Sequence, residues 1–335
     1  MGRFPWIALL AWIALLAVAG CGGTERDSPS VGSPPEPTLL FLAGDGELTV
    51  VDVDPGRAER HPVAELAPGD PLYRIVRRGN ELVLYGGDTY VLDLDLRSPP
   101  RKLGDSWFFI PSAKPDRVWL AHLDPASPET ARALAGVREV SVDGRVTFPH
   151  VRPPGGRWPV AAVGGALVFE DRRGGLELWN PATGEFTQRL PGASRGPSHG
   201  NLLAWCEHDG GILHVTDVET GRDQKVAPPQ GFVAFDCWSG AFSPDGTSLA
   251  VPARAGGYGA DRSLALVDLA RGVAVAVEGS AVEDGYVFLA WSAAGDRVFM
   301  SGGASERQLL QYELGDPRAL RLAVEVRDFY GMAAR

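Results

Sequence analysis

The pentapeptide 192–196 is the first candidate for chemistry in this chain. It is Gly-Ala-Ser-Arg-Gly and so matches the G-x-S-x-G pattern of serine nucleophiles. Such a serine stands at a sharp turn that follows a strand and precedes a helix. Here Pro191 comes before the pentapeptide and Pro197 after it, which indicates a loop. We therefore interpret the match as chance.

Two histidines are the next candidates, because His208 and His214 flank a short Asp-Gly-Gly segment in an expected hairpin. Facing histidines can bind a metal ion, but a site needs at least three protein ligands, and no third is evident. The chain also lacks H-E-x-x-H and a phosphate-binding glycine loop with Lys and Ser/Thr. From the sequence we assign no catalytic residue, no metal site and no cofactor.

The elements that would position any site come from a unit that repeats about every 43 residues. Its clearest copy gives a strand, a tight turn and a strand over 241–251, then a further strand and turn over 263–272. Seven such units have a turn after a strand with Asp, Asn, Ser or Tyr near its end: Asp52, Asp93, Ser141, Asn180, Asp217, Asp268 and Tyr312. This pattern predicts an all-β fold, a seven-bladed β-propeller of four-stranded antiparallel blades.

One copy of the repeat resembles a known family. Ser243-Pro244-Asp245-Gly246 with the strand that follows is similar to the repeat of TolB-like and WD-repeat-like propellers, and 291–296 is a degenerate copy. The resemblance implies a binding scaffold, often for other proteins and only sometimes an enzyme. A propeller enzyme would gather acidic, His or Asn side chains in its central channel, and Asp236 and Asp284 are the candidates for such a set.

The N-terminus forms a separate segment. Residues 1–20 combine Arg3, an apolar run and small residues before Cys21, which predicts a signal peptide. The tetrapeptide 18–21, Val-Ala-Gly-Cys, resembles the lipobox of bacterial lipoproteins, which implies cleavage before Cys21 and a lipid on its sulfur. An ordinary cleaved signal or an uncleaved anchor are the alternatives. The composition of 21–37 predicts a Gly/Ser/Pro tether that starts at Cys21. Residues 38–335 are the predicted propeller.

Two further cysteines, Cys206 and Cys237, lie in neighbouring repeats. In an oxidising compartment an even number of cysteines favours a disulfide. Two buried free thiols are the alternative. The predicted location is the extracytoplasmic face of the cell membrane, held by the lipid anchor.

Enlarged loops mark one face of the propeller as the expected binding face. They fall between second and third strands, at 124–136, 254–262 and 301–307, and the blade connections lie on the same face. Aromatic and arginine side chains dominate protein interfaces, so the candidate partner-binding residues there are Arg157, Trp158, Arg195, His199, Trp238, Tyr258 and Tyr286. A core position for the aromatic residues, or simple solvation of the arginines, is the alternative.

The net charge of −10 excludes a nucleic-acid partner, because such proteins need a basic surface to neutralise phosphates. We predict a monomeric, membrane-anchored extracytoplasmic scaffold that binds a protein or a cell-envelope component through one propeller face. The alternative is a propeller hydrolase or lyase that acts on a sugar or lactone in the central channel.

Overall fold

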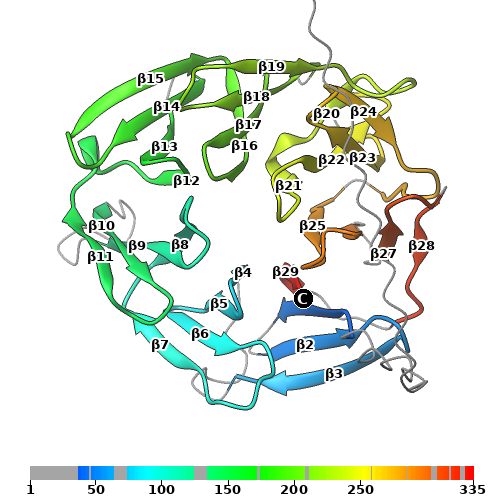
Figure 1. Cartoon of the computed structure of the whole chain (residues 1–335), viewed down its shortest axis with the longest axis horizontal. Helices are drawn as coiled ribbons and strands as arrows, with labels where there is room; N and C mark the ends of the chain where they lie inside the picture. Colours follow the sequence, from blue (N-terminus) through cyan, green and yellow to red (C-terminus); the bar gives the residue numbers. More distant parts are fainter. Residues whose placement is uncertain are drawn as a thin grey trace, which may run out of the picture. The chain divides into compact units, whose positions relative to one another are not determined.

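The computed structural model describes residues 37–44, 47–63, 74–123, 134–171, 174–207, 211–257, 259–283, 285–302, 308–316, 318–324 and 329–335. These residues form seven antiparallel sheets around a central axis, which confirms the predicted seven-bladed β-propeller (Figure 1). Besides strands, the described ranges contain two 3-10 turns, η2 (Pro154–Gly156) and η3 (Cys237–Ser239). The described residues include no helix with the length and hydropathy that a membrane span requires.

Each blade contributes to four concentric layers, with one strand in each except that two short strands share the inner layer of the β22 blade. The inner layer contains β29 (Phe329–Ala334), β4 (Arg74–Arg78), β8 (Phe108–Pro111), β12 (Pro159–Val163), β16 (Ala193–His199), β20 (Ala234–Phe235) with β21 (Ala241–Phe242), and β25 (Phe288–Trp291). The second layer contains β1 (Leu39–Gly44), β5 (Glu81–Tyr85), β9 (Arg117–Leu123), β13 (Ala166–Glu170), β17 (Leu202–Glu207), β22 (Ser248–Arg254) and β26 (Arg297–Gly302).

The two outer layers complete the blades. The third contains β2 (Glu47–Asp52), β6 (Thr89–Asp93), β10 (Leu134–Ser141), β14 (Gly175–Asn180), β18 (Leu213–Asp217), β23 (Arg262–Asp268) and β27 (Gln308–Glu313). The fourth contains β3 (Arg57–Pro62), β7 (Arg101–Gly104), β11 (Val146–Val151), β15 (Glu185–Pro191), β19 (Asp223–Val226), β24 (Val273–Ala276) and β28 (Leu320–Arg321). Outer strands are mostly exposed, as in β3, whereas the second-layer strand β5 is mostly buried.

The ring is closed by the pairing of its first strand with its last. β29 is the inner strand of the blade that β1, β2 and β3 form, with Phe41 opposite Ala333 and Leu42 opposite Met332. Gly331 allows β29 to approach the next blade, because a Cβ there would lie 3.0 Å from the backbone nitrogen of Ile75. Strands distant in sequence therefore complete a single blade (Figure 1).

Every blade packs against two neighbours through apolar side chains. On β1, Phe41 and Ala43 belong to the core shared with β4–β6, whereas Leu40 and Leu42 belong to the core shared with β25–β27. Successive side chains of a strand point to opposite faces, so a strand buried on both faces must be apolar at nearly every position. The described residues form seven such clusters, one between each pair of adjacent blades.

The turns between third and fourth strands explain the residues that recur along the sequence. The carboxylate of Asp217 accepts hydrogen bonds from the backbone N–H groups of Glu219 and Thr220, at 3.0 and 3.2 Å. Asp268 accepts in the same way from Ala270 and Arg271, at 2.9 and 3.0 Å. These side chains replace backbone partners that the turn cannot supply.

A second type of turn, between inner and second strands, is centred on a buried serine. The Ser243 hydroxyl donates to the carboxylate of Asp245 at 2.6 Å and accepts from the backbone N–H of Ser248 at 2.9 Å. Ser292 repeats both bonds with Asp296 and Arg297, at 2.6 and 3.1 Å. The Ser-Pro-Asp-Gly motif and its degenerate copy thus share one hydrogen-bonded turn.

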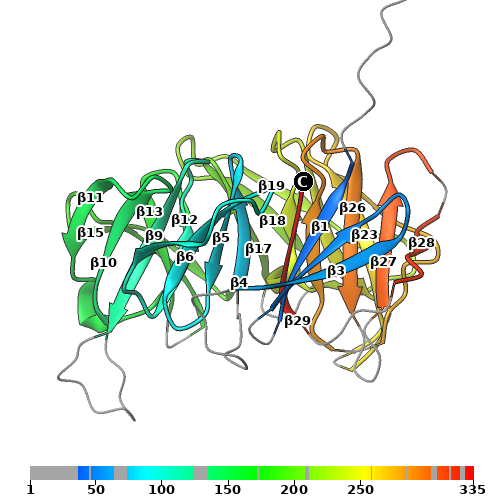
Figure 2. The same ribbon diagram turned by 90° about the horizontal axis from the view of Figure 1, so that it is seen from below.

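The strands run between two faces of the disc (Figure 2). One, the turn face, carries the turns between inner and second strands and between third and fourth strands. The other, the loop face, carries the connections between second and third strands and between blades. Parts of the enlarged loops, 124–133, Tyr258 and 303–307, lie outside the described residues. Leu134–Gly136 at the end of the first loop begin β10, whereas 255–257 and 259–261 of the second are bends, turn or irregular structure.

The assignment of 192–196 to a loop is wrong, because Ala193 to His199 form the inner strand β16. Its sequence is polar and contains Gly and Pro, so it lacks the apolar pattern of a strand. Arg195 pairs with Trp205 of β17, and a register shift follows before Ser198. Ser194 is followed by more strand and not by a helix, so the nucleophile geometry does not arise.

Replacement of the buried turn serine tests the account of the Ser-Pro-Asp-Gly motif. Ser243→Ala leaves the Ser248 N–H without its acceptor, so we expect the free energy of unfolding to fall by roughly 1–2 kcal/mol. Urea denaturation measures the change. Thr183→Ala, in an exposed turn, is the control and changes stability by less than about 0.5 kcal/mol. Equal stability of the two variants would contradict the assigned role of the hydroxyl.

Candidate functional site

A cavity of 420 Å³ opens on the loop face between the blades that contain β13, β17 and β22. We call it the rim cavity. It is lined by Glu170, Asp171, Gly174, Gly175, Ala193, Ser194, Arg195, Cys206, Glu207, Phe235, Asp236, Cys237, Trp238 and Arg254. The wall thus includes two residues from the predicted partner-binding set and both predicted disulfide cysteines.

The cavity exists because the inner strand of one blade is interrupted. β20 pairs with the end of β22 and β21 pairs with its beginning, and η3 bulges out between them. η3 lies against β16 at Gly196, where a Cβ would be 3.2 Å from the carbonyl oxygen of Cys237 and 2.6 Å from that of Ala204. Glycine at 196 therefore allows η3 to pack closely on the neighbouring blade.

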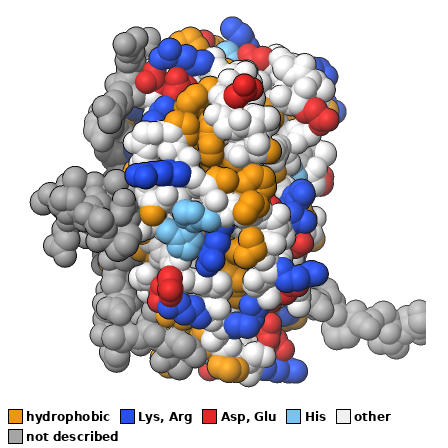
Figure 3. Space-filling view, turned by 90° about the vertical axis from the view of Figure 1, so that its left-hand side faces the viewer, with side chains coloured by type: hydrophobic (Ala, Val, Ile, Leu, Met, Phe, Trp, Pro, Cys, Tyr) orange, Lys and Arg blue, Asp and Glu red, His pale blue; other side chains and the backbone are white. Residues whose placement is uncertain are grey.

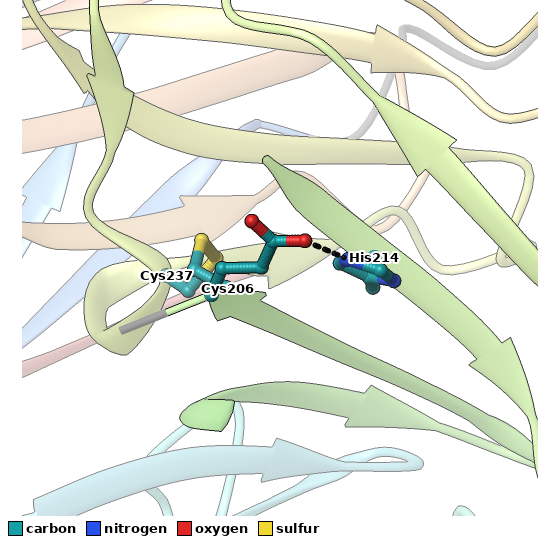
Figure 4. The surroundings of a disulfide bond; sticks show 4 residues. Cys206, His214 and Cys237 are labelled. Atoms are coloured by element: carbon teal, nitrogen blue, oxygen red, sulfur yellow. Dashed lines mark hydrogen bonds and ion pairs between the residues drawn. A yellow bond between two sulfur atoms is a disulfide. The ribbon is translucent and has the colours of Figure 1, made fainter. Parts of the chain in front are cut away.

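A disulfide fixes η3 to that neighbouring blade. Cys206 at the end of β17 is bonded to Cys237 of η3, with the two Cα atoms 5.9 Å apart (Figure 4). Both cysteines are buried in the core that these two blades share. The bond joins the two elements that support the rim cavity.

Arg195 and Trp238 form the most prominent contact at the rim. The guanidinium carbon of Arg195 lies 3.3 Å from the centroid of a Trp238 ring, within cation–π range. Its Nε lies 3.4 Å from a carboxylate oxygen of Glu170. Burial lowers the pKa of Arg195, and the charge of Glu170 opposes that shift. Trp238 is nevertheless 62% exposed, so its ring is accessible to solvent and is not part of the core.

The carboxylates around the rim cavity are engaged by basic groups. They form pairs of Glu170 with Arg195, Asp171 with Arg189, Glu207 with His214, and Asp236 with Arg262. No group of three or more His, Cys, Asp or Glu residues suited to a metal ion occurs within the described part of the chain.

His214, one of the two candidate metal ligands, is a structural residue. It is buried, its ring stacks on Trp205 with centroids 3.8 Å apart, and its Nδ1 lies 2.7 Å from a carboxylate oxygen of Asp223. Its Nε2 lies 3.2 Å from Glu207, near the disulfide (Figure 4). Both ring nitrogens are therefore occupied, and His208 lies outside the described residues.

The other predicted partner-binding residues are dispersed. Arg157 donates to a carboxylate oxygen of Glu177 at 2.5 Å and lies over the rings of Phe169 and Phe186. Trp158 packs on Phe108 with ring centroids 5.2 Å apart. Neither lines the rim cavity, and both are held by contacts within the fold.

Two further predicted residues lie along the central channel. Tyr286 precedes β25 on the loop face and is 77% exposed. His199 ends β16 at the turn face, where burial and the charge of Arg78 lower its pKa against the effect of Asp245. The structure thus gathers Arg195, Trp238 and Tyr286 toward the loop face and places His199 at the opposite end. Tyr258 lies outside the described residues.

The central channel is a second cavity, of 530 Å³, to which all seven inner-strand positions contribute. Arg195 and Trp238 line it as well as the rim cavity. Its described lining contains no Asp or Glu. Asp236 pairs with Arg262 and does not line the channel, and Asp284 lies outside the described ranges. The carboxylate set that the enzyme alternative requires is thus not assembled by the described lining residues.

Sequence reasoning missed Arg74 and Arg78, which line this channel on β4. The signal is their spacing of four residues in a strand before the turn at Gly79-Asn80, which puts both arginines, with Val76 between them, on one face. Only the closed ring reveals that this face is turned toward the axis.

Comparisons with known proteins identify the fold. No protein-family model and no curated protein matches the sequence. Among solved structures, apo AztD from Citrobacter koseri is 13% identical, with a TM-score of 0.52 over 89% of this chain and 98% of that one. TolB from Acinetobacter baumannii is 12% identical, with a TM-score of 0.52 over 89% of this chain and 66% of that one. This chain therefore shares a propeller fold with both and spans about two-thirds of the TolB chain.

Removal of the disulfide tests its contribution to the site. The two cysteines are 31 positions apart, so the Cys206→Ala, Cys237→Ala double variant should lose roughly 3–4 kcal/mol of unfolding free energy. Chemical denaturation measures the loss. A reducing agent lowers the stability of the wild-type protein but not of the double variant. A wild-type protein unaffected by complete reduction would refute this contribution.

Proposed function

We propose that the chain is a lipid-anchored, extracytoplasmic binding propeller that engages a protein or cell-envelope partner through the rim of its loop face. The observation that carries the proposal is the exposed Arg195–Trp238 stack beside the rim cavity. Trp119, Trp179, Trp205 and Trp291 are buried, whereas Trp238 is mostly exposed. Exposure of so large an apolar ring next to a cavity favours a binding role.

The chemistry of the rim suits a protein partner. Tryptophan, tyrosine and arginine are the residues that contribute most to binding energy at protein interfaces, and Arg195, Trp238 and Tyr286 are of these types. By contrast, acidic, basic and apolar side chains are interspersed on the outer wall near β10, β11 and β15 (Figure 3). The loop face is therefore the better candidate for a specific contact.

The rim is also held in place before a partner arrives. η3 is linked by a disulfide to β17, and the Arg195 side chain is held between Glu170 and the Trp238 ring. A side chain that is already ordered loses less conformational entropy on binding. This pre-organisation supports a stable binding surface.

The anchor is the second part of the proposal and depends on the lipobox-like sequence before Cys21. A diacylglyceryl group provides two acyl chains, which is enough for stable membrane attachment. The segment 22–37 between Cys21 and the propeller is rich in Gly, Ser and Pro, which is the composition of a tether. A protein tethered in this way can engage partners near the membrane.

Substitution at the rim tests the binding surface. We expect Trp238→Ala to reduce, by about tenfold or more, the recovery of a stoichiometric partner that co-purifies with the full-length protein from detergent-solubilised membranes. Quantitative mass spectrometry measures the recovery. Leu320→Ala is the control, because Leu320 is 61% exposed on the outer strand β28. Equal recovery with both variants would exclude the rim as the contact.

Substitution of Cys21 tests the anchor. Cys21→Ser removes the sulfur that would carry the lipid, so we expect the protein to move from the membrane fraction to the soluble fraction and to lack the diacylglyceryl mass. Fractionation and intact-mass spectrometry measure both. The Cys206→Ala, Cys237→Ala variant, which retains Cys21, should stay in the membrane fraction. Unchanged fractionation and mass for Cys21→Ser would refute the lipid anchor.

A further inference from the structure

The central channel contains an unbalanced set of positive charges. Arg74, Arg78 and Arg195 line it, whereas its described lining includes no Asp or Glu. The whole chain carries a net charge of −10, so this concentration of cations runs against the overall charge. Arg195 is paired with Glu170 at the rim. Arg74 and Arg78 form no ion pair with a described carboxylate.

Both unpaired arginines retain free hydrogen-bonding capacity. Arg74 donates to the carbonyl oxygen of Phe109 at 3.1 Å, and Arg78 donates to that of Ser112 at 2.8 Å. The Nε of Arg78 is buried and has no hydrogen-bond partner. A guanidinium has five N–H donors, so most donors of each group have no protein acceptor among the described residues.

These charges are unfavourable without a counter-charge. Burial, followed by the charge of Arg195, lowers the pKa of Arg74 to about 10. Burial and the charge of Arg74 lower the pKa of Arg78 to about 10, against the opposing effect of Asp116. Both groups are still protonated at neutral pH. Desolvated like charges destabilise a fold unless a counter-charge is supplied, and an anion in the channel would supply it.

The charges occupy two levels along the axis. Arg74 begins β4 near the loop face, where its charge interacts with that of Arg195. Arg78 ends β4 near the turn face, where its charge acts on His199. Asp116 and Asp245 approach this lower level, but Asp116 is beside Arg117 and Asp245 is bonded within its turn. Four residues of strand separate the two arginine Cα atoms by roughly 13 Å.

Apolar side chains form part of the channel wall. Its residues include Val76, Ile110, Val160, Ala161, Leu289 and Met332. The volume of 530 Å³ falls in the range of small-molecule sites, which is about 300–1,000 Å³. A matching ligand therefore has anionic ends and an apolar middle.

We propose that the central channel binds a small, elongated organic dianion. One anionic group, a carboxylate or a phosphate, meets Arg74 and Arg195 near the loop face, and the other meets Arg78 near the turn face. The apolar body lies between them. This site goes beyond the proposed partner contact and is separable from it, because Arg74 and Arg78 do not line the rim cavity.

Calorimetric titration of the full-length protein in detergent with suberate, an eight-carbon dicarboxylate, tests the site. Octanoate and 1,8-octanediol are the ligand controls, with one anionic group and none. We expect suberate to bind at least about tenfold more tightly than octanoate, and the diol not to bind. Suberate that fails to bind, or that binds no better than octanoate, would overturn the proposal.

Variants locate the bound anion. Arg74→Gln and Arg78→Gln keep hydrogen-bonding groups but remove one charge each, so each should weaken suberate binding by about tenfold or more. Arg145→Gln is the control, because the Arg145 side chain is 82% exposed. If both channel variants bound suberate as the wild-type protein does, the channel assignment would be wrong. Normal partner recovery by these variants would show that the rim contact is intact, so the two proposals can fail separately.

The wild-type protein allows one test that does not depend on the folding of a variant. Two charge–charge contacts make suberate binding sensitive to salt, so raising the ionic strength from roughly 0.05 to 0.5 M should weaken it several-fold. Suberate affinity that did not change with salt would contradict an electrostatic channel site.

Discussion

The structure depends on one constraint, which is that each blade has two apolar faces and must bury both. An open row of blades would leave two such faces in water, whereas a closed ring leaves none. The pairing of β1 with β29 closes the ring, so that seven apolar clusters fill seven blade interfaces in the described part of the chain. The apolar runs of the second-layer strands, the small residues of β29 and the position of the channel all follow from this closure.

Closure also explains why the two candidate sites lie where they do. The inner strands surround the narrow central channel, so their polar side chains converge on its axis. Where one inner strand is interrupted at η3, the wall opens and Trp238 reaches the loop face. The rim cavity and the central channel share Arg195 and Trp238 because these two residues belong to adjacent blades that border both cavities.

The fold was predictable from sequence because its signals are local. Asp217 and Asp268 accept hydrogen bonds from residues two and three positions later, so the turns they form can be read from a few residues. Counting cysteines left Cys206 and Cys237 as the pair that could bond, whereas their bonding depends on the fold, which puts their Cα atoms 5.9 Å apart. Strand β16 was not predictable, because its polar sequence with Gly and Pro has no strand periodicity and it is held by Trp205 of the neighbouring strand and by η3.

The sites were only partly predictable, because convergence is a property of the ring. Arg195, Trp238 and Tyr286 were expected on the loop face from their types and positions, but Arg157 is occupied by Glu177, a contact across 20 residues that no local pattern indicates. Arg74 and Arg78 looked like ordinary strand residues. Arg74 becomes part of a cluster of positive charges only because the ring brings it near Arg195, which belongs to a different blade.

The pairing of β1 with β29 has a consequence for how the chain reaches its native state. It joins residues from opposite ends of the propeller sequence, and contacts of such large sequence separation form slowly. Until they form, the two terminal blades each expose an apolar flank to solvent. Such flanks are prone to associate with other chains. The unclosed ring is therefore the species in which this protein is most exposed to aggregation and to proteolysis.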